Sequence, residues 1–340
     1  MSVVEIPEWP YVYGRPSAQG IIRHFPEDFL VIENLSFEPE GQGEHAFLYV
    51  EKKDENTDYI ARQLARFAQV RQQDVSYAGL KDRHAVTRQW FSIWLPGKPD
   101  LDWSILNSPT LKVLKNLRHA RKLKRGALSS NQFTITIRQL QGDKAVLIQR
   151  LEAIKQGGIA NYFGSQRFGL SGQNINKALE LFAGKKAKRE QRSLYLSAAR
   201  SYLFNQVLSQ RVQQNNWNQA IPGDVFMFDQ SHSCFSSEHA DEGILARLHA
   251  GAIHPVAALW GLGQSGAALE ALQLEQQVIE ENKELAQGLL NFGLEMDKRA
   301  LRVMLQDFTW HFDNDDLLSL NFTLPAGSYA TSVLREIIEI

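Results

Sequence analysis

The sequence predicts an α/β (α+β) fold in which one discontinuous domain is interrupted by a mostly helical insert. Strand-like and helix-like patterns alternate over about the first 150 residues, the texture changes at a glycine-rich block, and strand patterns return near the C-terminus. We place the discontinuous domain at residues 1–156 and 305–340 and the insert at residues 157–304.

The length and composition agree with two folded domains. The chain has 340 residues, 44% of them hydrophobic, and about 100 to 200 residues make up an ordinary domain. Its apolar runs are shorter than the ~18 residues of a membrane helix. The N-terminus lacks the basic residues of a signal peptide, and the single Cys234 excludes an internal disulfide framework. We therefore expect a cytoplasmic protein that has no membrane segment.

The first part of the chain contains four strand patterns and two helix patterns. The strands are expected at residues 47–51, 75–78, 90–95 and 132–138. In the last of these, Phe133, Ile135 and Ile137 alternate with polar residues, which predicts one buried face. One helix, with an apolar face from Ile60 to Ala68, is expected after a cap at Asn56, Thr57 or Asp58. A second helix is expected at residues 147–154, before a glycine pair.

The pattern of residues changes after residue 156, and the remaining elements are predicted from the new pattern. Residues 157–172 contain five glycines among aromatic and polar residues, which predicts a loop or hinge. Apolar spacing then predicts long helices over residues 196–207 and 267–290. Strands are expected again at residues 308–312 and 317–324, followed by a turn at residues 325–327 and a short helix from Thr331 or Ser332.

Charge is distributed unevenly, although the formal net charge is -1. Basic clusters lie at residues 112–125 and 185–192, whereas residues 270–297 are mainly acidic. One basic run is as easily a solvated face as a binding site, but two runs with nearby aromatic residues favour a nucleic-acid surface.

The segment richest in chemistry is residues 77–89, between two predicted strands. Asp82 follows a lysine and precedes Arg83 and His84, so its ionised form should be favoured. Such a carboxylate suits nucleophilic or general-base work, but an ordinary turn aspartate has the same local sequence. Local chemistry alone leaves both interpretations open.

Two other motifs have weak support. Gly261, Gly263 and Gly266 match a dinucleotide-binding spacing, but the expected second strand and acidic residue are missing, so a glycine turn is preferred. His232, Cys234 and His239 formally allow a metal site, although their spacing matches no known geometry.

In several separate blocks, taken in order, the chain resembles the TruD-type tRNA pseudouridine synthases. The blocks are residues 23–33 with 43–45, residues 77–89, residues 126–128 with 131–133, residues 161–169, and residues 324–332 with 334–336. The resemblance covers nearly the whole chain and is far more specific than any lone motif above.

The resemblance implies a pseudouridine-synthase catalytic domain with a mixed, mainly antiparallel sheet, interrupted by a largely helical α/β insert peculiar to the family. It implies that Asp82 is the catalytic aspartate, that Phe29 and Tyr329 line the uracil or stack on it, and that Asn131 binds the target nucleotide. The family usually has lysine where this chain has Arg23, a substrate-binding candidate. The exchange keeps the charge but leaves open whether Arg23 is a partner of the catalytic carboxylate or of a phosphate.

The implied reaction converts uridine to pseudouridine at position 13 of tRNA. It is redox-neutral, so neither metal nor nucleotide cofactor is expected, and we expect a monomer that binds tRNA. Basic residues are expected to contact the RNA: Lys81, Arg83, His84, Arg121, Lys122, Lys124, Arg125 and Arg167. A catalytically silent RNA-binding or RNA-folding protein on the same scaffold is the main alternative. A metal-dependent hydrolase is the weaker one.

Overall fold

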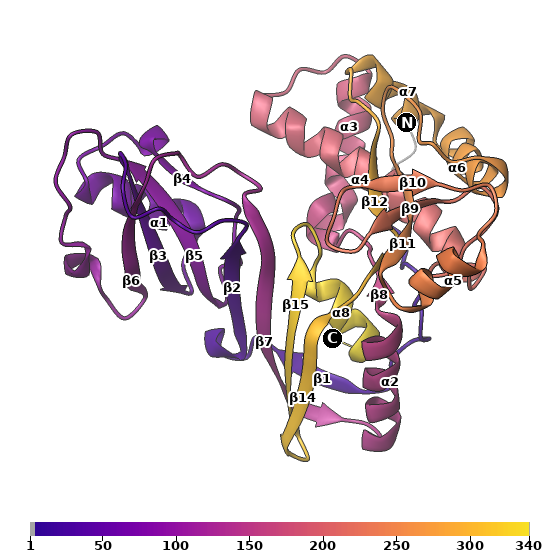
Figure 1. The fold of residues 1–340 in the computed structure, drawn as a ribbon, viewed down its shortest axis with the longest axis horizontal. Helices are drawn as coiled ribbons and strands as arrows, with labels where there is room; N and C mark the ends of the chain where they lie inside the picture. The colour runs from indigo at the N-terminus through magenta and orange to yellow at the C-terminus, as the bar shows by residue number, and fades with distance from the viewer. Residues whose placement is uncertain (1–3, 340) are drawn as a thin grey trace. The chain divides into compact units, whose positions relative to one another are not determined.

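The computed structural model describes residues 4–339, which form two compact units (Figure 1). We call the first the helical unit: it comprises residues 144–304 and 328–337 with the N-terminal segment up to Pro16. The second, the sheet unit, comprises residues 17–143 and 305–327 with the C-terminal segment from Ile338. The fold is mixed α+β, as the sequence predicts. No helix within residues 4–339 is long and apolar enough to cross a membrane.

A nine-stranded sheet forms the sheet unit, in the order β14-β15-β7-β2-β5-β3-β6, with β1 paired to β7 and β4 to β5. The strands are β1 (Gln19–Ile22), β2 (Phe29–Leu35), β3 (His45–Lys53), β4 (Val75–Tyr77), β5 (Val86–Trp94), β6 (Leu111–His119), β7 (Leu128–Gln141), β14 (Gln306–Asn314) and β15 (Leu317–Pro325). Helix α1 (Thr57–Phe67) and the short 3-10 turns η1 (Pro26–Asp28), η2 (Gln72–Asp74) and η3 (Trp103–Leu106) complete the unit. Strands β2 and β5 are parallel, and the other pairs are antiparallel, so the sheet is mixed and mainly antiparallel.

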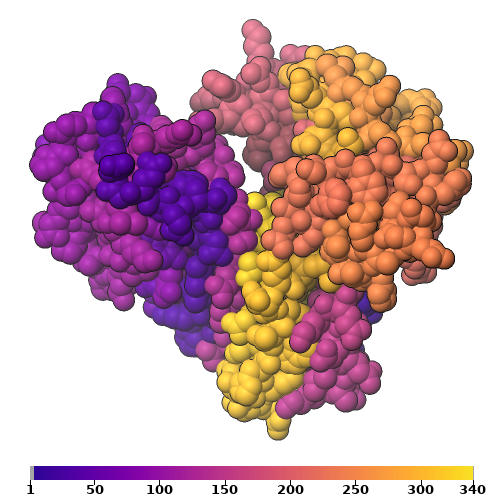
Figure 2. All heavy atoms as spheres, viewed as in Figure 1, coloured from indigo at the N-terminus to yellow at the C-terminus, as the bar shows by residue number. Residues whose placement is uncertain are grey.

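The centre of this sheet joins segments that lie far apart in the sequence. Strand β7 pairs with β2 on one side and with β15 on the other, so Phe133 lies opposite both Val31 and Phe322. The Phe133 and Phe322 rings stack with centroids 5.3 Å apart. The predicted alternation is confirmed, because Phe133, Ile135 and Ile137 are all buried. In the space-filling view, yellow atoms of the C-terminal part abut the violet atoms of β7 (Figure 2).

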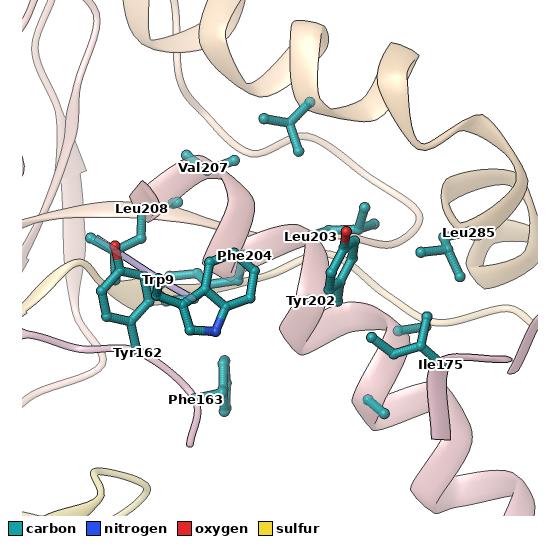
Figure 3. Packing of buried hydrophobic residues seen from close by; sticks show 14 of the residues in the cluster. Trp9, Tyr162, Phe163, Ile175, Tyr202, Leu203, Phe204, Val207, Leu208 and Leu285 are labelled. Carbon is teal, nitrogen blue, oxygen red and sulfur yellow. The ribbon is translucent and has the colours of Figure 1, made fainter. Parts of the chain in front are cut away.

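The helical unit is built around the long helix α4. Its helices are α2 (Lys144–Gly157), α3 (Gln173–Phe182), α4 (Arg189–Gln213), α5 (Glu242–His249), α6 (Leu269–Glu281), α7 (Lys283–Asn291) and α8 (Ala330–Ile337). Strands β9 (Val225–Phe228), β10 (Cys234–Ser236), β11 (Ile253–Leu259) and β12 (Asp297–Ala300) form a four-stranded sheet, and β8 (Ile159–Ala160) pairs with β13 (Arg302–Val303). Trp9 stacks on Tyr162 at 5.8 Å beside the buried residues of α4 (Figure 3).

Two sequence predictions within this unit are wrong in detail. The helix expected over residues 267–290 is two helices, because Asn282 has non-helical angles (φ -125°, ψ 38°) and its side chain donates to the carbonyl of Val278. The block at residues 157–172 is not an open hinge. It contains β8 and the turns η4 (Ser165–Phe168) and η5 (Leu170–Gly172), and Tyr162 and Phe168 are buried in the core.

The compact units do not follow the boundaries predicted from sequence. Helix α2, the N-terminal segment and α8 group with residues 158–304. Buried Glu336 of α8 accepts hydrogen bonds from the backbone of Val12 and Tyr13, and Arg150 of α2 donates to the carbonyls of Tyr13 and Gly14. These polar bonds hold the three segments together. The functional division into a catalytic domain and an insert at residues 157–304 stays a prediction.

Candidate active site

Asp82 lies in the loop between β4 and β5, which buried polar groups hold in place. Gln89 of β5 donates to the carbonyl of Gly79, and the backbone N–H of Lys81 donates to the Thr57 hydroxyl at the start of α1. The Thr57 hydroxyl donates in turn to the Gln89 amide oxygen, and both side chains are buried. The loop is therefore anchored just before Asp82 by groups that have few alternative partners.

Two cations contact Asp82 from different directions. The Arg23 guanidinium lies 3.1 Å from the Asp82 carboxylate, and the two side chains are 24% and 34% exposed. The Lys52 ammonium donates at 2.7 Å to the backbone carbonyl of Asp82. Arg23 has a left-handed backbone conformation, with φ of 58°, which is uncommon for a residue other than glycine. The carboxylate is thus partly open to solvent and electrostatically supported.

Phe29 lies directly beneath Arg23 at the start of β2. The guanidinium carbon is 4.2 Å from the centroid of the Phe29 ring, which is 1% exposed. Phe133 meets the same ring edge-on at 6.2 Å. A base that stacks on Phe29 therefore has to take the place of the Arg23 guanidinium.

Asn131 occupies β7 directly opposite Glu33 of β2. Glu33 is buried, accepts from the backbone N–H of Trp90 and forms an ion pair with Lys81 at 2.8 Å. The Asn131 amide oxygen is buried, and no group among residues 4–339 donates to it. An unmatched buried acceptor costs about 1–3 kcal/mol, so this oxygen is prepared to accept a hydrogen bond.

Tyr329 and Arg167 belong to the helical unit, where they contact each other. Arg167 donates to the Tyr329 hydroxyl at 2.6 Å and to the Ser197 hydroxyl at 2.9 Å. Phe163 packs against the Tyr329 ring at 6.1 Å, and the Arg299 guanidinium lies 4.0 Å from the Phe163 centroid. Burial lowers the pKa of Arg299 to about 10, so it remains a cation at neutral pH.

The structure thus brings together Arg23, Phe29 and Asp82 in the sheet unit, and Arg167 and Tyr329 in the helical unit. Asn131 also lies in the sheet unit, opposite Glu33, which forms the ion pair with Lys81.

The predicted RNA-contacting residues have different environments. Lys81 is 7% exposed and paired with Glu33, so it supports the loop rather than facing solvent. His84 lies 2.9 Å from Asp54, and Lys122 donates to the carbonyl of Gln73. Five residues of the predicted set are exposed without a carboxylate partner among residues 4–339. These are Arg83, Arg121, Lys122, Lys124 and Arg125.

Sequence reasoning missed Lys52. Along β3 the inward positions are occupied by Ala46, Leu48 and Val50, and the next inward position is Lys52, which has 0% exposure. A charged residue at an apolar position of an alternating strand is the signal that identifies it. The same pattern also fits an ordinary strand end. It therefore identifies Lys52 only once the structure shows that the ammonium contacts Asp82.

The glycine and metal motifs behave as ordinary structure. Gly261 packs against the backbone of Glu295 in the loop after β11, and α6 begins only at Leu269. Within residues 4–339, no group of three His, Cys, Asp or Glu side chains is arranged to hold a metal ion, so His232, Cys234 and His239 belong to no such group.

Comparison with known proteins gives the family. The model for "tRNA pseudouridine synthase D (TruD)" matches residues 7–181 and 173–337. The chain is 50% identical over 332 residues to tRNA pseudouridine synthase D of Methylococcus capsulatus, covering 97% of this chain and 94% of that protein. It is 42% identical to the Hydrogenovibrio crunogenus protein of the same name, covering 99% of this chain and 98% of that one.

The fold has a solved counterpart. The crystal structure of a TruD protein from Methanosarcina mazei superposes with a TM-score of 0.73 at 24% identity, covering 97% of this chain and 96% of that one. The chain is one of the tRNA pseudouridine synthases, a class of isomerases. Within that class, it belongs to the tRNA pseudouridine synthase D (TruD) family.

Proposed function

We propose that the protein isomerises uridine to pseudouridine at position 13 of tRNA, with Asp82 as nucleophile or base. The observation that carries this proposal is the Asp82 carboxylate, which is partly exposed on an anchored loop and paired with Arg23 at 3.1 Å. A carboxylate held at a fixed position by a cation is poised to react with a bound substrate.

The reaction needs no redox partner. The bond between C1′ and N1 breaks, the base turns, and C5 bonds to C1′. The hydrogen on C5 leaves as a proton, and N1, which keeps the electron pair of the broken bond, takes up a proton. Asp82 either attacks the sugar or removes a proton, and no electron is gained or lost overall. Both routes use the same carboxylate. Asp82 is therefore the reactive residue in either case, and attack on the sugar and removal of a proton stay alternatives.

Recognition of the uridine would use Phe29, Asn131 and Tyr329. The target base must leave its stack, and a flipped base is held by ring contacts and by hydrogen bonds to its edge. The unmatched amide oxygen of Asn131 suits the N3–H donor of uracil. Phe29 and Tyr329 supply aromatic rings. The Arg23 guanidinium already covers the Phe29 ring, and the Arg167 guanidinium already donates to the Tyr329 hydroxyl.

Phosphate contacts would come from exposed cations. Arg121, Lys124 and Arg125 lie in the exposed connection between β6 and β7. In the helical unit, a groove of about 190 Å³ is lined by Lys177, Lys185 and Tyr195, among others. Because Lys185 is paired with Glu180, the neighbouring Lys186 is the better phosphate ligand there.

Replacing Asp82 by asparagine tests the chemistry. We expect Asp82→Asn to abolish tritium release from tRNA labelled at C5 of uridine, because the amide neither attacks nor accepts the proton. Asp102→Asn is the matched control, since Asp102 caps η3 and asparagine caps a helix equally well.

Wild-type tritium release by Asp82→Asn would remove Asp82 from the mechanism. Absence of pseudouridine after wild-type protein is incubated with unmodified tRNA would favour the silent RNA-binding alternative. Mapping pseudouridine in RNA from cells that lack the protein tests position 13.

We also propose that the protein acts as a monomer in the cytoplasm without a nucleotide cofactor. Light scattering at micromolar concentration would show a mass near 38.6 kDa, and cell fractionation would show where the protein resides. A dimer mass, or activity that depends on an added nucleotide, would contradict this proposal.

A further inference from the structure

Lys52 is a charged residue in a place where charges are rare. It lies on β3 with 0% exposure, and its ammonium donates to the backbone carbonyl of Asp82 at 2.7 Å. Lysine is almost never fully buried unless it is paired, because removing the ammonium from water is energetically costly. Neighbouring Lys53, by contrast, is 41% exposed and paired with Glu27.

We infer that Lys52 is a positioning residue for Asp82, which fixes the main chain of the reactive aspartate from the interior and places a positive charge behind its carboxylate. This inference rests on the proposed function, in which Asp82 is the group that reacts. Lys52 would thus support the reaction although its side chain does not reach the solvent.

The contacts around the loop show what Lys52 adds. Thr57 and Gln89 anchor the residues before Asp82, and Arg23 holds the carboxylate from the exposed side. The bond from Lys52 acts at Asp82 itself, on the carbonyl that directly follows the Cα carrying the carboxylate. Because a misplacement of about 1 Å can cost a hundredfold in rate, a fixed main chain at this residue matters for the chemistry.

The charge of Lys52 depends on its surroundings. Burial lowers its pKa to about 8, while the charges of Asp82, Glu55 and Asp54 oppose that fall and Lys81 adds to it. The residues opposite Lys52 on the flanking strands are Thr87 of β5 and Leu111 of β6, and neither is charged. The ammonium is therefore mainly protonated at neutral pH and loses its proton as the pH rises through about 8.

The test compares Lys52→Met with Lys53→Met. Methionine keeps an unbranched apolar chain that is one atom shorter than lysine, and it removes the donor and the charge. With enzyme in excess over C5-tritiated tRNA, we expect the single-turnover rate of Lys52→Met to fall by about ten- to a hundredfold, with tRNA affinity changed less than about threefold. Lys53→Met, on the neighbouring solvent-facing position, should keep the wild-type rate.

A second readout is the pH dependence of the single-turnover rate. In wild type and Lys53→Met the rate should decline as the pH rises through about 8, because Lys52 is then deprotonated. Lys52→Met should lack this decline. A residue that only stabilises the fold would lower the melting temperature without changing the shape of the profile.

Either of two results overturns the inference. One is a wild-type rate that stays constant from pH 7 to pH 9, which needs no variant and so stands even if Lys52→Met does not fold. The other is a folded Lys52→Met with a wild-type rate or an unchanged alkaline decline. If Asp82→Asn is inactive in the same assay, these results reject the role of Lys52 alone. An active Asp82→Asn rejects the proposed function instead.

Discussion

At the scale of single residues, Arg23 does two jobs with one planar group. Its guanidinium pairs with Asp82 at 3.1 Å and covers the Phe29 ring at 4.2 Å. A lysine at this position keeps the charge but has no plane to lay over a ring. The two contacts can therefore be separated by substitution.

We expect Arg23→Lys to retain tritium release within about tenfold of wild type, and Arg23→Gln to lose about a hundredfold, because the charge beside Asp82 matters more than the plane. Both variants are compared by kcat and KM on the same tRNA. Equal activity of the two variants would show that the charge of Arg23 is dispensable.

The sequence predicts part of this site. The basic neighbours of Asp82 single it out, yet its local sequence also fits an ordinary turn, and only the family resemblance favours catalysis. The contact between Arg23 and Phe29 could not be predicted, and neither could the left-handed backbone of Arg23, a conformation that arginine rarely adopts. The ion pair between Lys81 and Glu33 joins residues 48 positions apart, which spacing alone does not reveal.

At the scale of elements, the turn η1 is tied to β7 by a buried carboxylate. Asp28 is 2% exposed, accepts three hydrogen bonds from Arg138 and also accepts from the backbone N–H of Phe25. Burial by itself raises the pKa of Asp28, but the bonds from Arg138 and Phe25 outweigh it and lower the pKa below its usual value. This carboxylate positions the chain directly before Phe29.

The lowered pKa gives the stability a definite pH dependence. The contribution of Asp28 is present above the ordinary aspartate pKa of about 4 and is lost as the pH falls through the lower, folded-state value. We expect Asp28→Asn to lower the unfolding free energy of the sheet unit by about 1–3 kcal/mol at pH 7, with a smaller difference at pH 3.

Asp74→Asn is the control, because Asp74 makes the same kind of turn contact with Arg71, whose side chain is 71% exposed. Calorimetry at the two pH values measures both variants. A difference between wild type and Asp28→Asn that grows toward pH 3 would contradict the assignment.

Element prediction succeeds where patterns are long and fails at local breaks. The strand around Phe133 and the helix after Asn56 are confirmed, since each has a clear buried face. The break at Asn282 escapes prediction because asparagine inside a polar helical stretch gives no strong stop signal. The glycines of residues 157–172 suggest mobility, but they make room for close packing: a Cβ on Gly164 would lie 3.0 Å from the Thr331 hydroxyl.

At the scale of the whole molecule, the net charge of -1 conceals exposed cations, such as Arg121 and Lys124, that have no carboxylate partner within residues 4–339. We expect the double variant Arg121→Gln with Lys124→Gln to bind tRNA more weakly. The slope of log affinity against log salt should shrink by about one for each phosphate that the double variant no longer neutralises.

The double variant Arg66→Gln with Lys283→Gln changes the net charge equally, on the exposed side of α1 and at the start of α7. Filter binding at several salt concentrations distinguishes a local contact from a general charge effect. Equal slopes for the two double variants would argue against a local role for Arg121 and Lys124.

Domain boundaries are the least predictable property at this scale. The change in sequence pattern places the boundaries at residues 156 and 304. The compact units depend instead on long-range hydrogen bonds, such as those that Glu336 accepts from the backbone of Val12 and Tyr13. The sequence around a buried carboxylate such as Glu336 does not show that its hydrogen-bond partners lie far away along the chain.

The placement of β15 and α8 has a consequence for synthesis on the ribosome. Strand β7 pairs with β15, and Glu336 of α8 accepts from the backbone of the N-terminal segment, so each unit takes one of its parts from residues 317–337. One edge of β7 and the backbone of Val12 therefore lack these partners until residues 317–337 have been synthesised. Completion of each unit is a late event in the life of the nascent chain, and a truncated product would expose an open sheet edge to aggregation.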